Sequence, residues 1–167
     1  VGFSQSLELL IETARAIPDV IVLINGDGAA RKSLEMAAQG LVNVKFGDYQ
    51  DVSRLSEVLA TGDLHVVPLR RGLGSVSVPS KTYSILAAAR PICAAIDLDT
   101  EVPRILAASN AGVCVEPDNS QAFVSAISAL IADRKTLEEM GLRGRKWVEG
   151  HASPQSVAQR YEALYTR

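Results

Sequence analysis

The hydrophobic and polar positions of the chain follow two spacings in alternation. In some segments apolar residues recur every three or four positions, which is typical of an amphipathic helix. Other segments are continuous apolar, β-branched runs, which are typical of strands buried on both faces. The runs predict strands over residues 20–25, 42–46, 63–69, 91–96 and 112–116. The helical spacing predicts helices before them, over residues 6–17, 29–39, 52–60, from about 80, and over 101–109.

Helices and strands that alternate with short breaks indicate an α/β fold with a parallel sheet. After Pro117 the pattern is helical only, with helices predicted over residues 120–132, 137–150 and 153–166. We therefore expect one Rossmann-like, doubly wound domain over residues 1–167, ending in a helical C-terminal tail.

The composition fits this fold and excludes some functions. A chain of 167 residues suits one domain with a sizeable core. The formal net charge is -2 and no long basic run occurs, so binding to nucleic acid through its phosphates is not expected. No apolar run is long enough to span a bilayer, and a cytoplasmic location is expected.

The residue types that commonly carry chemistry are sparse. Cys93 and Cys114 lie in short apolar runs and are interpreted as buried strand residues, with no metal-ligand spacing around them. His65 lies inside a predicted strand and His151 in a turn between helices. Neither has a nucleophile and a carboxylate at recognisable spacing, so a hydrolytic triad and a metal site are not expected.

Ligands of open α/β sheets bind beyond the carboxyl ends of the strands. The predicted loops at that edge are residues 25–28, 47–49, 68–81 and 97–101. In the first of them, Gly26, Asp27 and Gly28 suggest a dinucleotide-binding turn. The third glycine of a GxGxxG motif is absent, however, and a plain strand-to-helix turn also explains both glycines.

The corner Pro79-Ser80-Lys81 carries a stronger signal. Ser80 can cap a helix, and Lys81 lies in the first turn, where a cation is unfavourable unless an anion is nearby. Glycines and serines between residues 72 and 77 give the preceding loop backbone donors and freedom to close. An exposed lysine above an ordinary helix start is the alternative. Arg70 and Arg71, which begin the loop, are interpreted as a solvated pair.

Several stretches together resemble the C-terminal, nucleotide-sugar-binding domain of a GT-B fold, family 4 retaining glycosyltransferase of the bacterial envelope-polysaccharide type. The stretches are VLINGDGAARKSLE, VNVKFGDYQ, LATGDLHVVPL, VPSKTYSILAAARPICA and AGVCVEPDNSQAFVSAI. The resemblance covers nearly the whole chain. Each stretch is weak by itself, and their order and spacing make the likeness specific.

The resemblance implies a donor site for a nucleotide-diphosphate sugar, with a UDP-sugar favoured, and no further cofactor. The loop at Gly47 would pass the nucleotide base, the turn at Gly26 would line the same cleft, and Lys81 would face the diphosphate. The implied donor-binding residues are Gly26, Asp27, Gly28, Gly47, Asp48, Tyr49, Ser77, Val78, Pro79, Ser80, Lys81 and Ser84. The catalytic residues stay unknown.

The chain departs from the family pattern at several positions. Family 4 often carries two glutamates eight positions apart, and the matching positions here are Val76 and Ser84. The second glutamate normally holds the ribose, a contact that Ser84 could make more weakly. Of the usual basic pair near the first strand, Gln5 stands near the place of the lysine, and the arginine would fall around Phe3 or earlier.

The resemblance also implies that parts of the usual enzyme are missing. These are the domain's first strand and an N-terminal, acceptor-binding domain, which often offers a membrane-facing surface. We therefore expect these 167 residues to bind donor at most, without catalysing transfer alone. Two alternatives remain open: a nucleotide-sugar 2-epimerase, and a degenerate, non-catalytic binding module.

Overall fold

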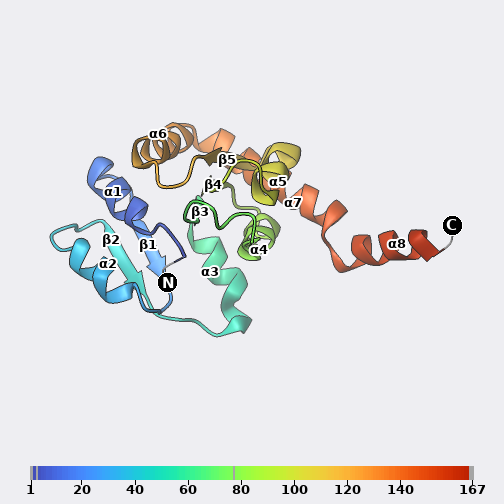
Figure 1. The fold of residues 1–167 in the computed structure, drawn as a ribbon, viewed down its shortest axis with the longest axis horizontal. Helices are drawn as coiled ribbons and strands as arrows, with labels where there is room; N and C mark the ends of the chain where they lie inside the picture. The colour runs from blue at the N-terminus through green and yellow to red at the C-terminus, as the bar shows by residue number, and fades with distance from the viewer. Residues whose placement is uncertain (1, 3, 77, 166–167) are drawn as a thin grey trace.

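The computed structural model describes residue 2, residues 4–76 and residues 78–165. Helices and strands alternate along the chain as the apolar pattern predicts (Figure 1). In chain order they are α1 (Glu8–Ala16), β1 (Val22–Asn25), α2 (Arg31–Ala37), β2 (Val44–Gly47), the 3-10 turn η1 (Val52–Arg54), α3 (Leu55–Thr61), β3 (His65–Pro68), α4 (Lys81–Ala87), β4 (Ile92–Ala95), α5 (Glu101–Ser109), β5 (Gly112–Val115), α6 (Ser120–Ile131), α7 (Arg134–His151) and α8 (Pro154–Tyr165).

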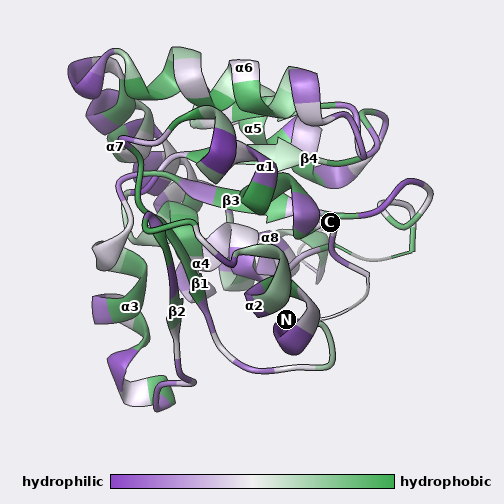
Figure 2. Cartoon of the chain, turned by 90° about the vertical axis from the view of Figure 1, so that its left-hand side faces the viewer, coloured by the Kyte–Doolittle hydropathy of each residue, from purple (hydrophilic) through white to green (hydrophobic). Residues whose placement is uncertain are grey.

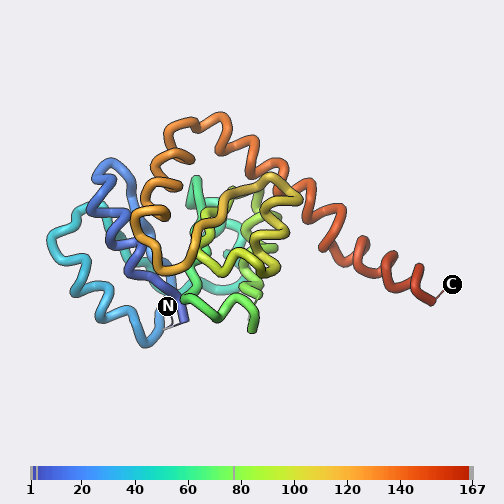
Figure 3. The backbone as a smooth tube through the Cα atoms, turned by 45° about the horizontal axis from the view of Figure 1, so that its top comes forward, coloured from blue at the N-terminus to red at the C-terminus, as the bar shows by residue number. Residues whose placement is uncertain are grey.

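The helical C-terminal tail is confirmed. Helix α7 starts at Arg134, three residues before its predicted start, because Asp133 caps it. The Asp133 carboxylate accepts the backbone N–H of Thr136 at 3.1 Å. Helix α8 extends away from the rest of the molecule and contacts α7 (Figures 1 and 3). None of its described residues is buried.

The strands form two parallel sheets. One holds β1 and β2, with Val22 opposite Val44. The other holds β3, β4 and β5, with β4 in the centre and Ile92 of β4 opposite Gly112 of β5. Among the described residues no strand pairing joins β1 to β3. The α/β class is confirmed, and each sheet has two edge strands, β1 and β2 in one and β3 and β5 in the other, whose outer sides have no strand partner among the described residues.

Packed helices hold the two sheets together. One apolar cluster contains Leu10 and Ile11 of α1, Ile24 of β1, Cys93 of β4 and Phe123 of α6, so it spans both sheets. Helices α1 and α6 lie side by side over this face. Figure 2 shows their apolar sides turned towards the strands. The contact between α1 and α6, with the strand residues beneath it, is called the junction below.

A second cluster covers the opposite face of the larger sheet. It contains Leu86 of α4, Ile92 and Ala94 of β4, and Leu106 of α5. Successive side chains of a strand point to opposite faces. Cys93 therefore joins the first cluster, while its neighbours Ile92 and Ala94 join the second. Helices on both faces complete the doubly wound arrangement.

Both cysteines are free, and their burial supports the core interpretation. Cys93 is buried and Cys114 is half-buried on the neighbouring strand. Burial raises the pKa of the Cys93 thiol to about 12 and that of Cys114 to about 11. Both thiols stay protonated at neutral pH, which makes them poor nucleophiles and poor metal ligands.

Candidate functional site

Two of the predicted loops meet at the carboxyl ends of the smaller sheet. Because β1 and β2 pair in parallel with Asn25 opposite Gly47, the turn that contains Gly26 lies beside the loop that starts at Gly47. The Gly26 N–H donates to the Gly47 carbonyl at 3.1 Å. Gly26 has a φ of 107°, which side-chain-bearing residues rarely adopt, so the turn requires glycine at this position.

Arg31 connects these two loops, and the sequence analysis missed it. It is the first residue of α2, and its Nη1 donates to the carbonyls of Gly26 at 3.0 Å and Gly47 at 3.2 Å. The same nitrogen lies 3.2 Å from the Asp48 carboxylate, and Nε lies 2.9 Å from Glu35. The hydrogen bond that Arg31 donates to Glu35, with the charges of Glu35 and Asp48, raises the pKa of Arg31. The only sequence signal for this role was the Arg31–Glu35 helical spacing.

The other predicted residues of these loops face solvent. Asp27 accepts the Gly28 N–H at 2.7 Å, which stabilises the turn. The Asp48 side chain is 88% exposed and that of Tyr49 is exposed as well. These groups are accessible to a ligand that sits above the loops.

The segment between β3 and α4 is anchored more firmly than its glycines suggested. The Asp97 carboxylate, which follows β4, accepts the N–H groups of Gly72 at 2.8 Å and Gly74 at 3.1 Å. A Cβ atom on Gly74 would lie 2.9 Å from the Thr100 methyl carbon, so the fit is tight. The N–H groups of Gly72 and Gly74, expected from the sequence to be available to a ligand, are therefore bonded within the protein.

The arginines of this segment remain exposed to solvent, as the interpretation of a solvated pair expects, and each also has an acidic partner. Arg70 pairs with Glu8 at 2.9 Å and Arg71 with Glu116 at 3.2 Å. The Asp118 carboxylate accepts hydrogen bonds from the Ser6 hydroxyl and the Arg71 N–H. These bonds lower the pKa of Asp118, the one from Ser6 most.

The corner at the start of α4 is accessible. Lys81 is the first residue of α4 and is exposed, the first turn holds no acidic residue, and Lys81 forms no salt bridge with any described residue. Val78 and Ser80 are exposed, Pro79 and Ser84 are half-buried, and Ser77 lies outside the described residues. The helix-capping role expected for Ser80 is wrong. Its backbone is already helical and its side chain makes no cap bond.

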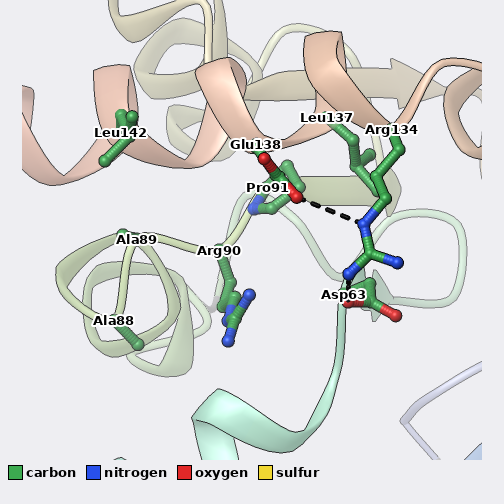
Figure 4. Close-up of a pocket in the computed structure, with 9 residues that line it drawn as sticks. All are labelled: Asp63, Ala88, Ala89, Arg90, Pro91, Arg134, Leu137, Glu138 and Leu142. Atoms are coloured by element: carbon green, nitrogen blue, oxygen red, sulfur yellow. Dashed lines mark hydrogen bonds and ion pairs between the residues drawn. The ribbon is translucent and has the colours of Figure 1, made fainter.

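One pocket lies away from these loops. It is lined by residues of the turns before β3 and β4 and of α7, including Asp63, Pro91 and Arg134 (Figure 4). Arg134 lies 4.0 Å from Asp63 and 3.2 Å from Glu138, so exposed ion pairs occupy its rim. The pocket sits at the amino ends of the strands, opposite the edge where such folds bind ligands.

A shallower groove begins at the candidate site. It is lined by Leu23, Asn25 and Gly47 of the smaller sheet and by Arg54 of η1 and Val58 of α3. Within the described parts of the chain, no group of histidine, cysteine and carboxylate side chains could hold a metal ion. No described helix has the length and apolar character needed to cross a membrane.

Comparison with known proteins decides the family. Residues 3–133 match the family described as Glycosyl transferases group 1. The chain belongs to this family. The match supports a transferase rather than the epimerase alternative.

Among individual relatives, "Putative colanic acid biosynthesis glycosyl transferase WcaI" of Escherichia coli (strain K12) is 34% identical over 132 residues. That match covers 76% of this chain and 32% of the relative, so the chain spans about a third of WcaI.

Two solved structures show that this glycosyltransferase chain has the fold of larger proteins. Sucrose-phosphate synthase from Thermosynechococcus elongatus matches with a TM-score of 0.80 at 20% identity, over 99% of this chain and 42% of that one. Anabaena Alr3699/HepE, crystallised in complex with UDP-glucose, matches with a TM-score of 0.75 at 18% identity, over 100% and 47%.

Proposed function

We propose that this chain is the donor-binding part of a retaining glycosyltransferase and binds a nucleotide-diphosphate sugar, with a UDP-sugar favoured. The sugar would pass to an envelope-polysaccharide or glycolipid acceptor held by an N-terminal domain. That domain would also provide any contact with the inner face of the membrane. The donor is the substrate, and the proposal requires no further cofactor.

The observation that carries this proposal is Lys81 at the start of α4, which is exposed and forms no salt bridge with any residue that the structure describes. A cation in the first helical turn is unfavourable without an anion, and the first turn of α4 contains no acidic residue. A sugar diphosphate supplies such an anion. Lys81 would stabilise the charge that develops on the diphosphate as the sugar leaves.

The two loops of the smaller sheet supply the nucleotide side of the proposed site. The turn at Gly26 and the loop from Gly47 to Tyr49 lie at the carboxyl ends of adjacent strands and expose polar groups. The complex of Alr3699/HepE with UDP-glucose supports a uridine donor, and the name of WcaI supports an envelope-polysaccharide product.

Val76 and Ser84 favour a second candidate function. They replace the two glutamates often present in family 4, and Val76 is exposed while Ser84 is half-buried. Without a carboxylate for the ribose hydroxyls, donor affinity would be weaker. A degenerate module that has lost donor binding altogether is the second candidate.

Calorimetric titration of the 167-residue chain with UDP and with GDP tests both candidates. We expect UDP to bind and Lys81→Ala to weaken binding by about tenfold or more, because a hydrogen bond to a charged group contributes about 1.5–3 kcal/mol. Lys135→Ala, which removes an exposed lysine on α7, is the matched control and should leave the affinity unchanged.

The outcomes separate the candidates. UDP binding that Lys81→Ala does not alter would overturn the role of Lys81 and place the nucleotide elsewhere. Absence of binding with both nucleotides would contradict the donor-binding proposal for this chain and favour the degenerate module.

A further inference from the structure

We propose that Arg31 is a positioning residue that locks the loop after β1 to the loop after β2, so that the two move as one unit. Its value for donor binding rests on the proposed function, because these loops form the nucleotide side of the proposed site. The locking itself does not depend on that function.

The contacts of Arg31 are those of a bridge. One nitrogen, Nη1, donates to carbonyls that follow two different strands, at Gly26 and Gly47. Nε is held by Glu35, one turn further along α2, which orients the guanidinium plane. The guanidinium carbon lies 5.9 Å from the centre of the Phe46 ring, and the side chain is only 20% exposed.

A lysine could not replace this arginine. Its ammonium is a single point charge on a flexible stem, whereas the guanidinium presents several N–H donors in a fixed plane. Only the planar group can keep the bond to Glu35 through one nitrogen while another reaches both carbonyls. Arg31→Lys therefore keeps the charge and removes the bridge.

The bridge also determines which groups of the second loop can contact a ligand. The Gly47 carbonyl accepts both the Gly26 N–H at 3.1 Å and Arg31 at 3.2 Å, so both of its lone pairs are used. Recognition of a base by this loop therefore falls to Asp48 and Tyr49 and not to the Gly47 carbonyl. Arg31 also offsets the charge of Asp48, which would otherwise repel an anionic nucleotide.

Residue-resolved amide hydrogen exchange on the 167-residue chain tests the locking directly. The Gly26 amide is the reporter for the first loop, and the amides of Gly47 and Asp48 report on the second. We expect Arg31→Lys and Arg31→Gln to accelerate exchange in both loops together, by about tenfold, and Glu35→Gln to have a smaller effect of the same kind. Arg145→Lys is the control, since it makes the same exchange in a similar helical pair, with Glu149, far along α7.

Titration with UDP gives the second readout. If UDP binding requires the two loops to be locked together, Arg31→Lys weakens UDP binding although it conserves the charge. The melting temperature of this variant changes little. Unchanged exchange, or acceleration in one loop only, overturns the locking. Loosened loops with unchanged UDP affinity overturn the positioning role. If the unmodified chain binds no nucleotide, the proposed function fails along with that role, and the exchange data still decide the locking.

Discussion

The junction predicts an unusual response to one core substitution, Phe123→Ala. Phe123 is fully buried in the cluster that spans both sheets. Removing a buried phenylalanine ring typically costs about 3–5 kcal/mol, which is a large part of the stability of about 5–15 kcal/mol of an ordinary domain. For a chain of this size that corresponds to a melting temperature lower by roughly 10 °C.

The same substitution should also separate the unfolding of the two sheets, because no strand pairing joins β1 to β3. Trp147, the single tryptophan, lies on α7 and packs against the second cluster, so its fluorescence reports on the larger sheet. Far-UV circular dichroism reports on all helices. In urea, we expect the two signals of Phe123→Ala to have different midpoints, with the dichroism changing first and the fluorescence later.

Met36→Ala is the control, because Met36 is 64% exposed and its removal should change stability by less than about 0.5 kcal/mol. A loss below about 1 kcal/mol in Phe123→Ala would contradict the burial argument. Coincident transitions in that variant would show that the sheets unfold together and that the junction is not the weak link.

Two further predictions concern stability. His65 lies against the Leu59 carbonyl at 2.8 Å, and burial lowers its pKa below the ordinary 6.5, so the unfolded chain takes up a proton that the folded chain resists. The free energy of unfolding should fall as pH drops below about 6.5, by at most about 1.4 kcal/mol per pH unit. Urea titrations at pH 7.5 and 5.5 measure this dependence. His65→Gln should remove it, whereas the control His151→Gln should keep it. Gly141→Ala would place a Cβ atom 2.1 Å from the Ala89 carbonyl oxygen and should lower the free energy of unfolding by about 1–3 kcal/mol. The Cβ atom of Gly150→Ala, in the same helix, would meet no atom within 4 Å, so this variant should be as stable as the original chain or more stable. Equal melting temperatures for the two alanine variants would refute the close packing of α7 against α4.

Local pattern predicted most of the fold and only part of the candidate site. Apolar periodicity located the strands and the carboxyl-end loops, because burial sets that periodicity directly. It could not reveal that Arg31 bridges two loops or that Asp97 anchors Gly72. Such contacts depend on which strands are neighbours and on where side chains from different loops converge.

The division of the sheet was likewise beyond the local signal. The runs that form β1 and β3 both look like buried strands, yet no strand pairing joins them among the described residues. The apolar pattern of a strand shows which faces of the sheet are buried. Which strands pair at their edges depends on the topology of the whole domain.

The divided sheet changes what a ligand has to do. In a continuous sheet, backbone hydrogen bonds set the spacing between the loops at one edge. Here the loops at Gly26 and Gly47 stand on one sheet and Lys81 follows a strand of the other. Among the described residues no strand pairing sets their separation, which depends on helix packing and on contacts such as the Arg70–Glu8 ion pair. A nucleotide sugar that contacts the loops of both sheets would hold the two sheets together. Part of its binding free energy would then appear as a higher free energy of unfolding.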